Sequence, residues 1–387
     1  MNLRNNQDFA YILHSHYSIL ICRFTQYSLG KSGMRFISSI LEKLQRHPKR
    51  IVFPAGTEPK IIQAARLFYS NRLGVPILLG DRTQIKKIAA ELNVPLEGVR
   101  IINPIESEDL EIFARRYEFL MKNTGIKLPE ARAAISKPLY FGAMMVALHQ
   151  ADAIIAGGVE STSTILRPLF QIIRTAPNVP TVSSCMILEF ENPNIGENGV
   201  LFLADCDVIP DPNTEQIADI SVETAKLALH LLNKRPRVAL LSFSTKGSAS
   251  HPTAVKMQAA AALAQQKANA IGLDADFDGE LQADAAIVPE IAAKKIPLTG
   301  KTHSVAGRAN VLIFPDLNSG SISSRLLQHV TCAHAYGQIL LGLDRPAVDI
   351  SRGATAHDIL GAAAIVGVQA TAYNKLYPGA GQKFPGE

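Results

Sequence analysis

Three side chains that can do chemistry lie within eight residues of each other near the C-terminal end. Ser351, Arg352 and Asp358 supply a hydroxyl, a guanidinium and a carboxylate, and Gly353 gives the segment flexibility. An arginine presents a planar set of donors that suits a phosphate or a developing oxyanion. A carboxylate can accept a proton from a reacting group. The combination predicts half of an active site for anionic substrates.

The same segment has the pattern of a helix start. Thr355 and Asp358 stand three residues apart before the apolar run 359–368, which predicts a capping box at the helix N-terminus. Free N–H groups and the positive end of the helix dipole favour anions there. A helix cap alone would also explain an acid at Asp358, so that structural role stands beside the role of a base.

Composition limits the classes of function. The chain has 387 residues, long enough for two packed domains, with 47% hydrophobic and 19% charged residues, as in globular proteins. A net charge of +5 fits a small anionic ligand. The chain has no Trp and no dense Lys/Arg stretch interleaved with aromatic residues, so we do not expect nucleic-acid binding.

The cysteines and the apolar runs bear on location. The four cysteines lie far apart, without a C-x-x-C pair, which favours reduced thiols and a cytoplasmic protein. The histidines show no metal-ligand spacing, so no metal site is expected. No apolar run reaches about 18 residues, so we expect no membrane span. Residues 1–33 make a poor secretory signal; we expect a poorly ordered extension, or a misplaced start codon with Met34 as the first residue.

Short apolar segments alternate with longer amphipathic ones from Met34 onward. We expect strands at 49–53, 75–79, 100–102, 153–156, 181–188, 200–205, 238–243, 286–288 and 311–314. We expect helices at 36–44, 59–69, 83–92, 109–122, 128–135, 142–150, 167–173, 214–232, 253–271, 322–335 and 358–375. This order predicts an α/β fold with mainly parallel sheets that are buried on both faces.

Strand-to-helix loops are where such a fold binds ligands. Five of them are rich in Gly, Ser, Thr or Asn: 54–57, 157–164, 242–248, 315–321 and 349–358. Each alone is also explained as a turn or a helix cap. Their repetition at the same end of the predicted strands favours a binding site. Neither a P-loop nor a dinucleotide-binding fingerprint is present.

Five motifs taken together resemble the phosphate acetyltransferase (phosphotransacetylase) and phosphate butyryltransferase family. They cover 163–168, 241–249, 278–286, 314–318 with Gly320, and 351–353, and their order and spacing are the family's from about residue 36 to 375. The resemblance implies two α/β/α domains with a cleft between them, an architecture like that of isocitrate and isopropylmalate dehydrogenases. It also implies a homodimer. We expect domain I at 34–177 plus 339–387 and domain II at 178–338.

The family interconverts an acyl-CoA plus phosphate with an acyl phosphate plus CoA. The resemblance implies no cofactor, because CoA is a substrate, and it allows stimulation by a monovalent cation. Asp358 matches the base toward the CoA thiol, Ser351 matches the hydroxyl that holds the thiol, and Arg352 matches the arginine that stabilises the phosphoryl group. The substrate- and CoA-binding residues implied are Arg167, Ser163, Thr164, Ser244, Thr245, Lys246, Gly247, Asn318, Gly320 and Gly353. We interpret Cys185 as a core residue.

Departures from the family pattern keep the acyl group open. Thr164 and Ile165 stand where acetyl-specific relatives usually carry Asp-Thr, Ala354 stands where Cys is frequent, and Met121 stands where some relatives have Arg. A phosphate butyryltransferase-like enzyme is therefore an alternative. A non-catalytic acyl-CoA-binding module and a decarboxylating dehydrogenase are the alternatives outside the acyltransferases.

Overall fold

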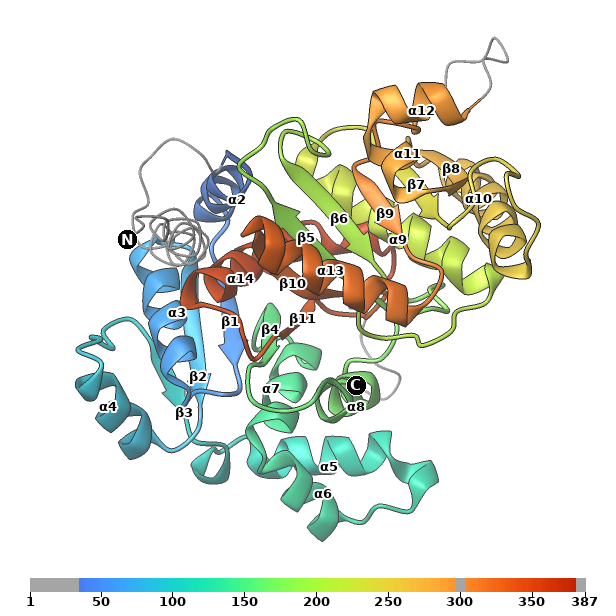
Figure 1. The fold of residues 1–387 in the computed structure, drawn as a ribbon. Helices are drawn as coiled ribbons and strands as arrows, with labels where there is room; N and C mark the ends of the chain where they lie inside the picture. Colours follow the sequence, from blue (N-terminus) through green and yellow to red (C-terminus); the bar gives the residue numbers. More distant parts are fainter. Residues whose placement is uncertain (1–34, 297–303, 381–387) are drawn as a thin grey trace, which may run out of the picture.

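One sheet of eleven strands runs through the molecule in a computed structural model that describes residues 35–296 and 304–380 (Figure 1). The order is β3-β2-β1-β4-β11-β10-β5-β6-β9-β7-β8. The strands are β1 (Lys49–Phe53), β2 (Gly74–Leu79), β3 (Arg100–Ile102), β4 (Ala153–Gly157), β5 (Ser183–Glu189), β6 (Val200–Ala204), β7 (Arg237–Leu241), β8 (Asp276–Leu281), β9 (Val311–Ile313), β10 (His334–Leu341) and β11 (Ala347–Ile350). The extension expected at 1–33 and Met34 lie outside the described residues.

Helices follow most strands. They are α2 (Arg35–Gln45), α3 (Pro59–Ser70), α4 (Arg82–Glu91), α5 (Leu110–Leu120), α6 (Leu128–Ile135), α7 (Pro138–Ala147), α8 (Thr162–Ile172), α9 (Thr214–Leu232), α10 (Pro252–Ala270), α11 (Ala283–Ile287), α12 (Pro289–Lys295), α13 (Leu317–Thr331), α14 (Ala356–Thr371) and α15 (Tyr373–Leu376). Short 3₁₀ turns η1 (Pro104–Glu106) and η2 (Lys122–Thr124) flank α5. Among the described helices, none is long and apolar enough to cross a membrane.

Two blocks of parallel strands make up the sheet. The first block is β3-β2-β1-β4-β11 and the second is β6-β9-β7-β8. Strands β10 and β5 join them through three successive antiparallel pairings. The mainly parallel α/β fold is thus confirmed. Because three reversals separate the blocks, they run in opposite directions, so the loops after β7 and β9 do not share a sheet edge with those after β1, β4 and β11.

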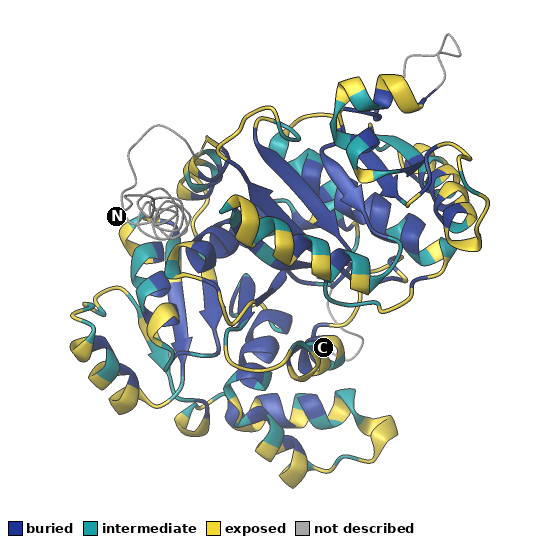
Figure 2. Cartoon of the chain, in the orientation of Figure 1, coloured by how far each residue is buried: buried dark blue, intermediate teal, exposed yellow. Residues whose placement is uncertain are grey.

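The strands are buried on both faces, as their sequences predict (Figure 2). Side chains along a strand alternate between faces. Ile51 and Phe53 of β1 accordingly join one apolar cluster, whereas Val52 joins another. The first cluster continues across both blocks, beneath α2, α3, α14, α9 and α10. On the opposite face the apolar residues divide into one cluster under α7 and α8 and another under α11, α12 and α13.

Three expected elements are wrong. The segment expected as a strand at 286–288 is the end of helix α11. The strand in this region is β8, which was not predicted because acidic residues alternate along it. The helix expected at 322–335 begins earlier, at Leu317, and ends at Thr331, because Cys332 adopts a left-handed conformation with φ 53°. Strand β10 begins at His334. The helix expected at 142–150 is α7, which starts at Pro138.

Two further expectations concern the domains and the cysteines. The division into 34–177 with 339–387 and 178–338 remains a prediction, and its boundary between 338 and 339 falls inside β10. Cys185 and Cys206 are free, buried thiols. The expectation of four reduced cysteines is wrong for Cys332, which is in a disulfide.

Candidate active site

The capping box predicted at Thr355 and Asp358 is present at the start of α14. The Asp358 backbone N–H donates to Thr355 Oγ1 at 3.2 Å. In return, Asp358 Oδ2 accepts hydrogen bonds from the Thr355 N–H at 2.9 Å and from its hydroxyl at 2.7 Å. One carboxylate oxygen, Oδ2, is therefore fixed by the helix start, and the cap donates no hydrogen bond to the second oxygen, Oδ1.

That second oxygen faces the start of β10. Asp358 is 8% exposed, and its Oδ1 lies 4.0 Å from His334 Nδ1. Next to His334 on the same strand, the Tyr336 hydroxyl donates to Glu189 Oε2 at 3.0 Å. Glu189 Oε1 accepts from the Phe36 N–H at 2.9 Å, and burial raises the Glu189 pKa. Asp358 is thus held at the inner side of the loop, with the His334 imidazole as its neighbour.

Ser351 and Arg352 lie on the exposed side of the same loop. The Gly353 N–H donates to Ser351 Oγ at 3.2 Å, and Lys60 Nζ donates to the Arg352 carbonyl oxygen at 3.1 Å. The Arg352 guanidinium forms no ion pair with any described residue. It is therefore free to bind an anion, and Lys60 adds a second positive charge beside it.

A cavity of about 670 Å³ lies at the carboxyl ends of β1 and β4. It is lined by Pro54, Ala55, Thr57, Glu58, Lys137, Pro138, Leu139, Tyr140, Gly157, Val159, Glu160, Ser163, Thr164 and Arg167. Three of the predicted binding residues, Ser163, Thr164 and Arg167, meet here. Within the described chain Arg167 has no ion-pair partner, so its charge is available to a ligand in the cavity.

Backbone contacts join this cavity to the Ser351 loop. The Gly158 N–H donates to the Ile350 carbonyl oxygen at 2.9 Å. A Cβ on Gly157 would lie 2.5 Å from that same oxygen and 2.5 Å from Asp349 Oδ1. Gly157 also has a φ of 95°, which glycine adopts readily. The strands β4 and β11 therefore approach closely at this point because residue 157 has no side chain.

The structure does not bring the loop after β7 into this group. Ser244 and Thr245 are buried, and the Ser244 hydroxyl donates to Glu280 Oε1 at 2.9 Å. The Gly247 N–H donates to the same oxygen at 2.7 Å, and Lys246 pairs with Asp278. β7 stands five strands from β11, roughly 24 Å at about 4.8 Å per strand. These contacts remain inside the second block and shape the loop itself.

Helix α13 carries the remaining two predicted residues. Asn318 is exposed in its first turn, and Gly320 is buried. A Cβ on Gly320 would lie 2.2 Å from the Asp205 carbonyl oxygen, so the glycine lets α13 pack closely against the loop after β6. That packing explains Gly320 without a ligand.

Cys185 lies in β5 and is fully buried, which confirms its place in the core. Burial raises the pKa of the Cys185 thiol, so the reactive thiolate is suppressed. Over residues 35–296 and 304–380, no group of three or more His, Cys, Asp or Glu side chains is placed to hold a metal ion.

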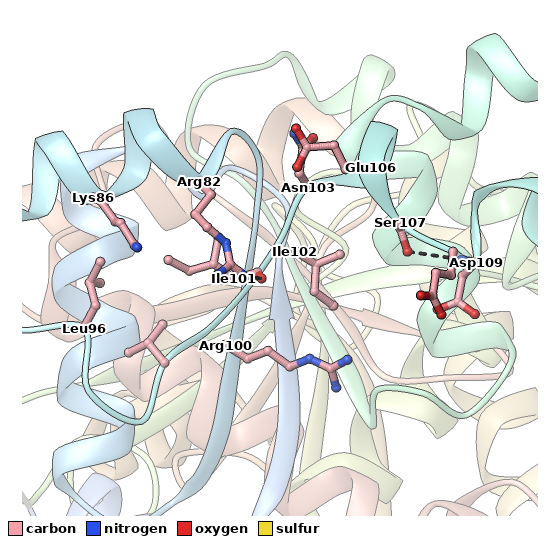
Figure 3. Close-up of a pocket in the computed structure, with 12 residues that line it drawn as sticks. Arg82, Lys86, Leu96, Arg100, Ile101, Ile102, Asn103, Glu106, Ser107 and Asp109 are labelled. Carbon is pink, nitrogen blue, oxygen red and sulfur yellow. Dashed lines mark hydrogen bonds between the residues drawn. The ribbon is translucent and has the colours of Figure 1, made fainter.

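A second pocket, of about 730 Å³, lies along the edge strand β3 (Figure 3). Its charged lining residues are Arg82, Lys86, Arg100, Glu106, Glu108 and Asp109. The three cations are balanced by three acids, and Arg82 Nη2 already donates to the Ile101 carbonyl oxygen at 3.2 Å. This pocket therefore suits an anionic substrate less well than the cavity beside Ser351.

The sequence interpretation missed several polar residues of the site. His334 was placed inside a helix, and no role was assigned to Asp349, Asp207, Thr162 or Arg325. A signal was present at Asp349, because a carboxylate between Val348 and Ile350 interrupts an apolar strand. Buried acids are rare unless they are paired, so such a residue marks a special environment.

Comparison with known proteins shows the family. Residues 35–367 match the family described as phosphate acetyl/butaryl transferase. The chain is 44% identical over 337 residues to a phosphate acetyltransferase of Thermoanaerobacterium thermosaccharolyticum, which covers 87% of this chain and 100% of the relative. A phosphate acetyltransferase of Acetivibrio thermocellus is 42% identical, covering 87% of this chain and 98% of the relative.

A solved phosphotransacetylase from Streptococcus pyogenes has the same fold. Its TM-score is 0.77 at 34% identity, covering 87% of this chain and 98% of that one. The protein is an enzyme of the acyltransferase class. It belongs to the phosphate acetyl/butyryl transferase family.

Removing the cap tests whether the helix start also serves catalysis. Thr355→Ala should lower the free energy of unfolding by about 1 kcal/mol, because the N-cap is lost. Asn213→Ala removes the matching capping box of α9, distant from the loop, and should cost a similar amount. Denaturant unfolding and acyl transfer would be measured for both. Only Thr355→Ala should also lower turnover, and equal turnover in the two variants would contradict a role for this cap in the site.

Proposed function

We propose that this enzyme is a phosphate acetyltransferase that interconverts acetyl-CoA and phosphate with acetyl phosphate and CoA. The observation that supports this most is the start of α14, where a buried carboxylate with one anchored oxygen follows, in the same loop, an exposed arginine that forms no ion pair with any described residue. The relatives at 44% and 42% identity are named phosphate acetyltransferases, which favours the acetyl group. Both substrates bind together, and the thiol attacks directly in the ternary complex.

Asp358 acts as the base toward the CoA thiol. A thiol has a reference pKa of about 8.5 and is mostly protonated at neutral pH, so a positioned carboxylate helps to form the thiolate. Oδ2 is held by Thr355, which leaves Oδ1 to accept the proton. The Ser351 hydroxyl holds the sulfur by donating a hydrogen bond to it.

Arg352 stabilises the charge that develops on the other substrate. The thiolate attacks the carbonyl carbon of acetyl phosphate, and a tetrahedral oxyanion forms. The carbon–oxygen bond to phosphate then breaks, and phosphate leaves with that electron pair. A guanidinium without an ion-pair partner in the described chain can stabilise both the oxyanion and the leaving phosphate, which is more useful in the transition state than in the ground state.

The neighbouring cavity holds the substrates. Ser163, Thr164 and Arg167 line it and supply two hydroxyls and a positive charge. Two anionic substrates held together need several cations, and Lys60, Arg167 and Arg352 provide them. Gly353 and the exposed Asn318 complete the proposed contacts. Lys246 and Gly247 stay in the proposal as CoA contacts, whereas Ser244 and Thr245 are better explained as loop supports because their side chains are buried.

A phosphate butyryltransferase-like reaction is the second candidate. Thr164 lines the cavity at a position where acetyl-specific relatives usually carry an acid. A wall without that acid suits a longer acyl chain. Acetyl-CoA and butyryl-CoA should therefore be compared as substrates with phosphate.

We expect kcat/KM for acetyl-CoA to exceed that for butyryl-CoA. Release of CoA thiol would be followed with each substrate, with and without Mg²⁺, and with Na⁺ or K⁺ as the monovalent ion. Activity without Mg²⁺ would support a reaction that needs no metal. A faster reaction with butyryl-CoA would overturn the acetyl assignment, and no transfer with either substrate would leave a binding module as the better description.

Asp358→Asn tests the base. The amide keeps the size of the side chain and removes the proton acceptor, so turnover should fall by about 10² or more while CoA binding remains measurable. Turnover and the dissociation constant of CoA would be measured on the same preparation. Asp211→Asn, at a side chain that is 88% exposed and outside the cavity, is the control for loss of one acidic charge. Unchanged turnover in Asp358→Asn would show that this carboxylate is not the base.

We also propose a homodimer in the cytoplasm. Cys185 and Cys206 are free thiols, as in a reducing location, whereas the disulfide at Cys332 is an exception to that pattern. For the dimer, Ile322, Leu326 and Val330 form a stripe along one side of α13 and are 65%, 61% and 71% exposed. Contiguous apolar side chains of this size are commonly covered by a partner, and a second copy offers the same stripe.

Leu326→Glu should convert the dimer to a monomer, because two copies would bring like charges into an apolar contact. Mass measured by light scattering would decide this. Ile112→Glu changes a similarly exposed residue on α5, 62% exposed, and should leave the mass unchanged. A dimer that survives Leu326→Glu would exclude α13 as the contact.

A further inference from the structure

A polar cluster fills the gap between the two apolar clusters on the divided face of the sheet. Asp349 stands between Val348 and Ile350, which both join the continuous cluster on the other face. Alternation along β11 therefore directs the Asp349 carboxyl group toward the divided face. Thr162 comes from α8 on one side of the gap, and Asp207 and Arg325 come from the loop after β6 and from α13 on the other.

Asp207 has donors for its charge. The Thr162 hydroxyl donates to Asp207 Oδ2 at 3.0 Å, and Arg325 Nη2 lies 3.7 Å from Asp207 Oδ1. Asp349 has fewer hydrogen-bond donors around its carboxyl group. It is 4% exposed, and its Oδ2 is buried and accepts no hydrogen bond from any described residue. The two carboxyl groups lie within hydrogen-bonding reach of each other.

Two adjacent buried carboxylates cannot both carry charge at low cost. The Thr162 hydroxyl donates its single hydrogen bond to Asp207. A negative charge is therefore better stabilised on Asp207 than on Asp349. A proton on Asp349 removes the repulsion and turns an orphaned acceptor into a donor. Burial, followed by the charge of Asp207, raises the pKa of Asp349 to about 7. Burial also raises the pKa of Asp207, and Thr162 and Arg325 oppose that rise.

The loop that carries Asp207 is itself firmly held. Asp205 Oδ1 accepts from the Ser184 N–H at 3.0 Å and from the Asp207 N–H at 3.1 Å. Asp205 Oδ2 accepts from the Ile209 N–H at 2.7 Å. Helix α13 packs against the Asp205 carbonyl oxygen through Gly320. Asp207 is therefore a fixed acceptor, and a bond from Asp349 would transmit that position to β11.

We propose that Asp349 is a positioning residue that works in its protonated form. Its carboxyl O–H donates to Asp207 and ties the end of β11, and with it Ser351 and Arg352, to the loop after β6 and to α13. The effect on turnover rests on the function proposed for Ser351 and Arg352, whereas the effect on stability does not.

The direction of the pH dependence follows from the raised pKa. An aspartate whose pKa is higher in the folded than in the unfolded chain stabilises the fold while it is protonated, and that stabilisation is lost as pH rises toward the folded value. The charged groups facing Asp349 are Asp207, with Asp205 behind it, and Arg325. Stability should therefore decline as pH rises from about 4 to about 7, and turnover should decline as Asp349 ionises around pH 7.

Asp349→Asn separates the proton from the shape of the side chain. The amide donates to Asp207 at every pH, so the decline should disappear. At pH 8.5 only about 3% of a group with pKa 7 keeps its proton. The ratio of turnover at pH 8.5 to turnover at pH 6 should thus be roughly tenfold or more higher in Asp349→Asn than in the wild type. The apparent Tm of the variant should change little over the same range, whereas that of the wild type should fall.

Asp211→Asn is the matched control, because it removes one acidic charge at a side chain that is 88% exposed and should keep the wild-type pH profile. Asp207→Asn is a second variant of the pair, in case Asp349→Asn does not fold, and should lessen the decline in Tm, because it removes the repulsion between two adjacent negative charges while burial still raises the Asp349 pKa. Asp349→Ala should lower turnover even at pH 6, and wild-type turnover there would overturn the positioning role.

A wild-type pH profile of Tm in both Asp349→Asn and Asp207→Asn would overturn the proposal, whatever the enzyme's substrate. The proposal would also be overturned if addition of K⁺ or Na⁺ alone abolished the decline of Tm with pH in the wild type, because a cation and not a proton would then join the two carboxylates. If no acyl transfer is found at all, the Tm measurements still decide the state of Asp349.

Discussion

Burial on the two faces of the sheet is unequal, and this inequality leaves one face with room for a buried polar cluster. On one face a single apolar cluster runs from α2 and α3 through α14 to α9 and α10, so the two strand blocks are joined by a continuous core. On the other face the apolar residues separate into two clusters. Asp349 lies on this divided face and is buried there, and burying such a polar group without a partner costs several kcal/mol.

Helix α14 lies on the other face, where it packs on the continuous core. Most of the helix is buried, including its first-turn residue Asp358. A carboxylate so placed needs donors, and Thr355 supplies two. Capping and proton transfer therefore use different oxygens of one side chain and do not compete. The base proposed here is held by the same bonds that start the helix, which gives it a fixed direction without any additional support.

Local patterns in the sequence predicted much of this arrangement. The capping box at Thr355 and Asp358, the strand at 49–53 and the helix at 214–232 were all predicted because they depend on neighbouring residues. The failures have non-local causes. Strand β8 carries Asp276, Asp278 and Glu280 and is held by pairing with β7, which no local pattern reveals. The reversal of the second block depends on β10, whose start was read as the end of a helix.

The site residues divide in the same way. Ser163, Thr164 and Arg167 line one cavity, as their common motif at 163–168 suggested. The Ser244 loop was grouped with them because it also follows a parallel strand, but it belongs to the oppositely directed block and is occupied with Glu280. His334 and Asp207 were missed because each acts through a residue distant in sequence. Only Asp349 could have been noticed from the sequence, because it is an acid in an otherwise apolar strand.

The close approach of β4 and β11 couples two positions that are almost two hundred residues apart. A side chain at 157 would occupy the space of the Asp349 carboxyl group, so the first cannot grow while the second is present. The φ of 95° adds a separate preference for glycine. Replacement of Asp349 by a smaller residue would remove one close contact, but the Ile350 backbone oxygen, at 2.5 Å from a Cβ on residue 157, would remain, together with the conformational restriction. The backbone of β11 therefore requires glycine at 157, and a lineage that lost the acid at 349 would gain no freedom at 157.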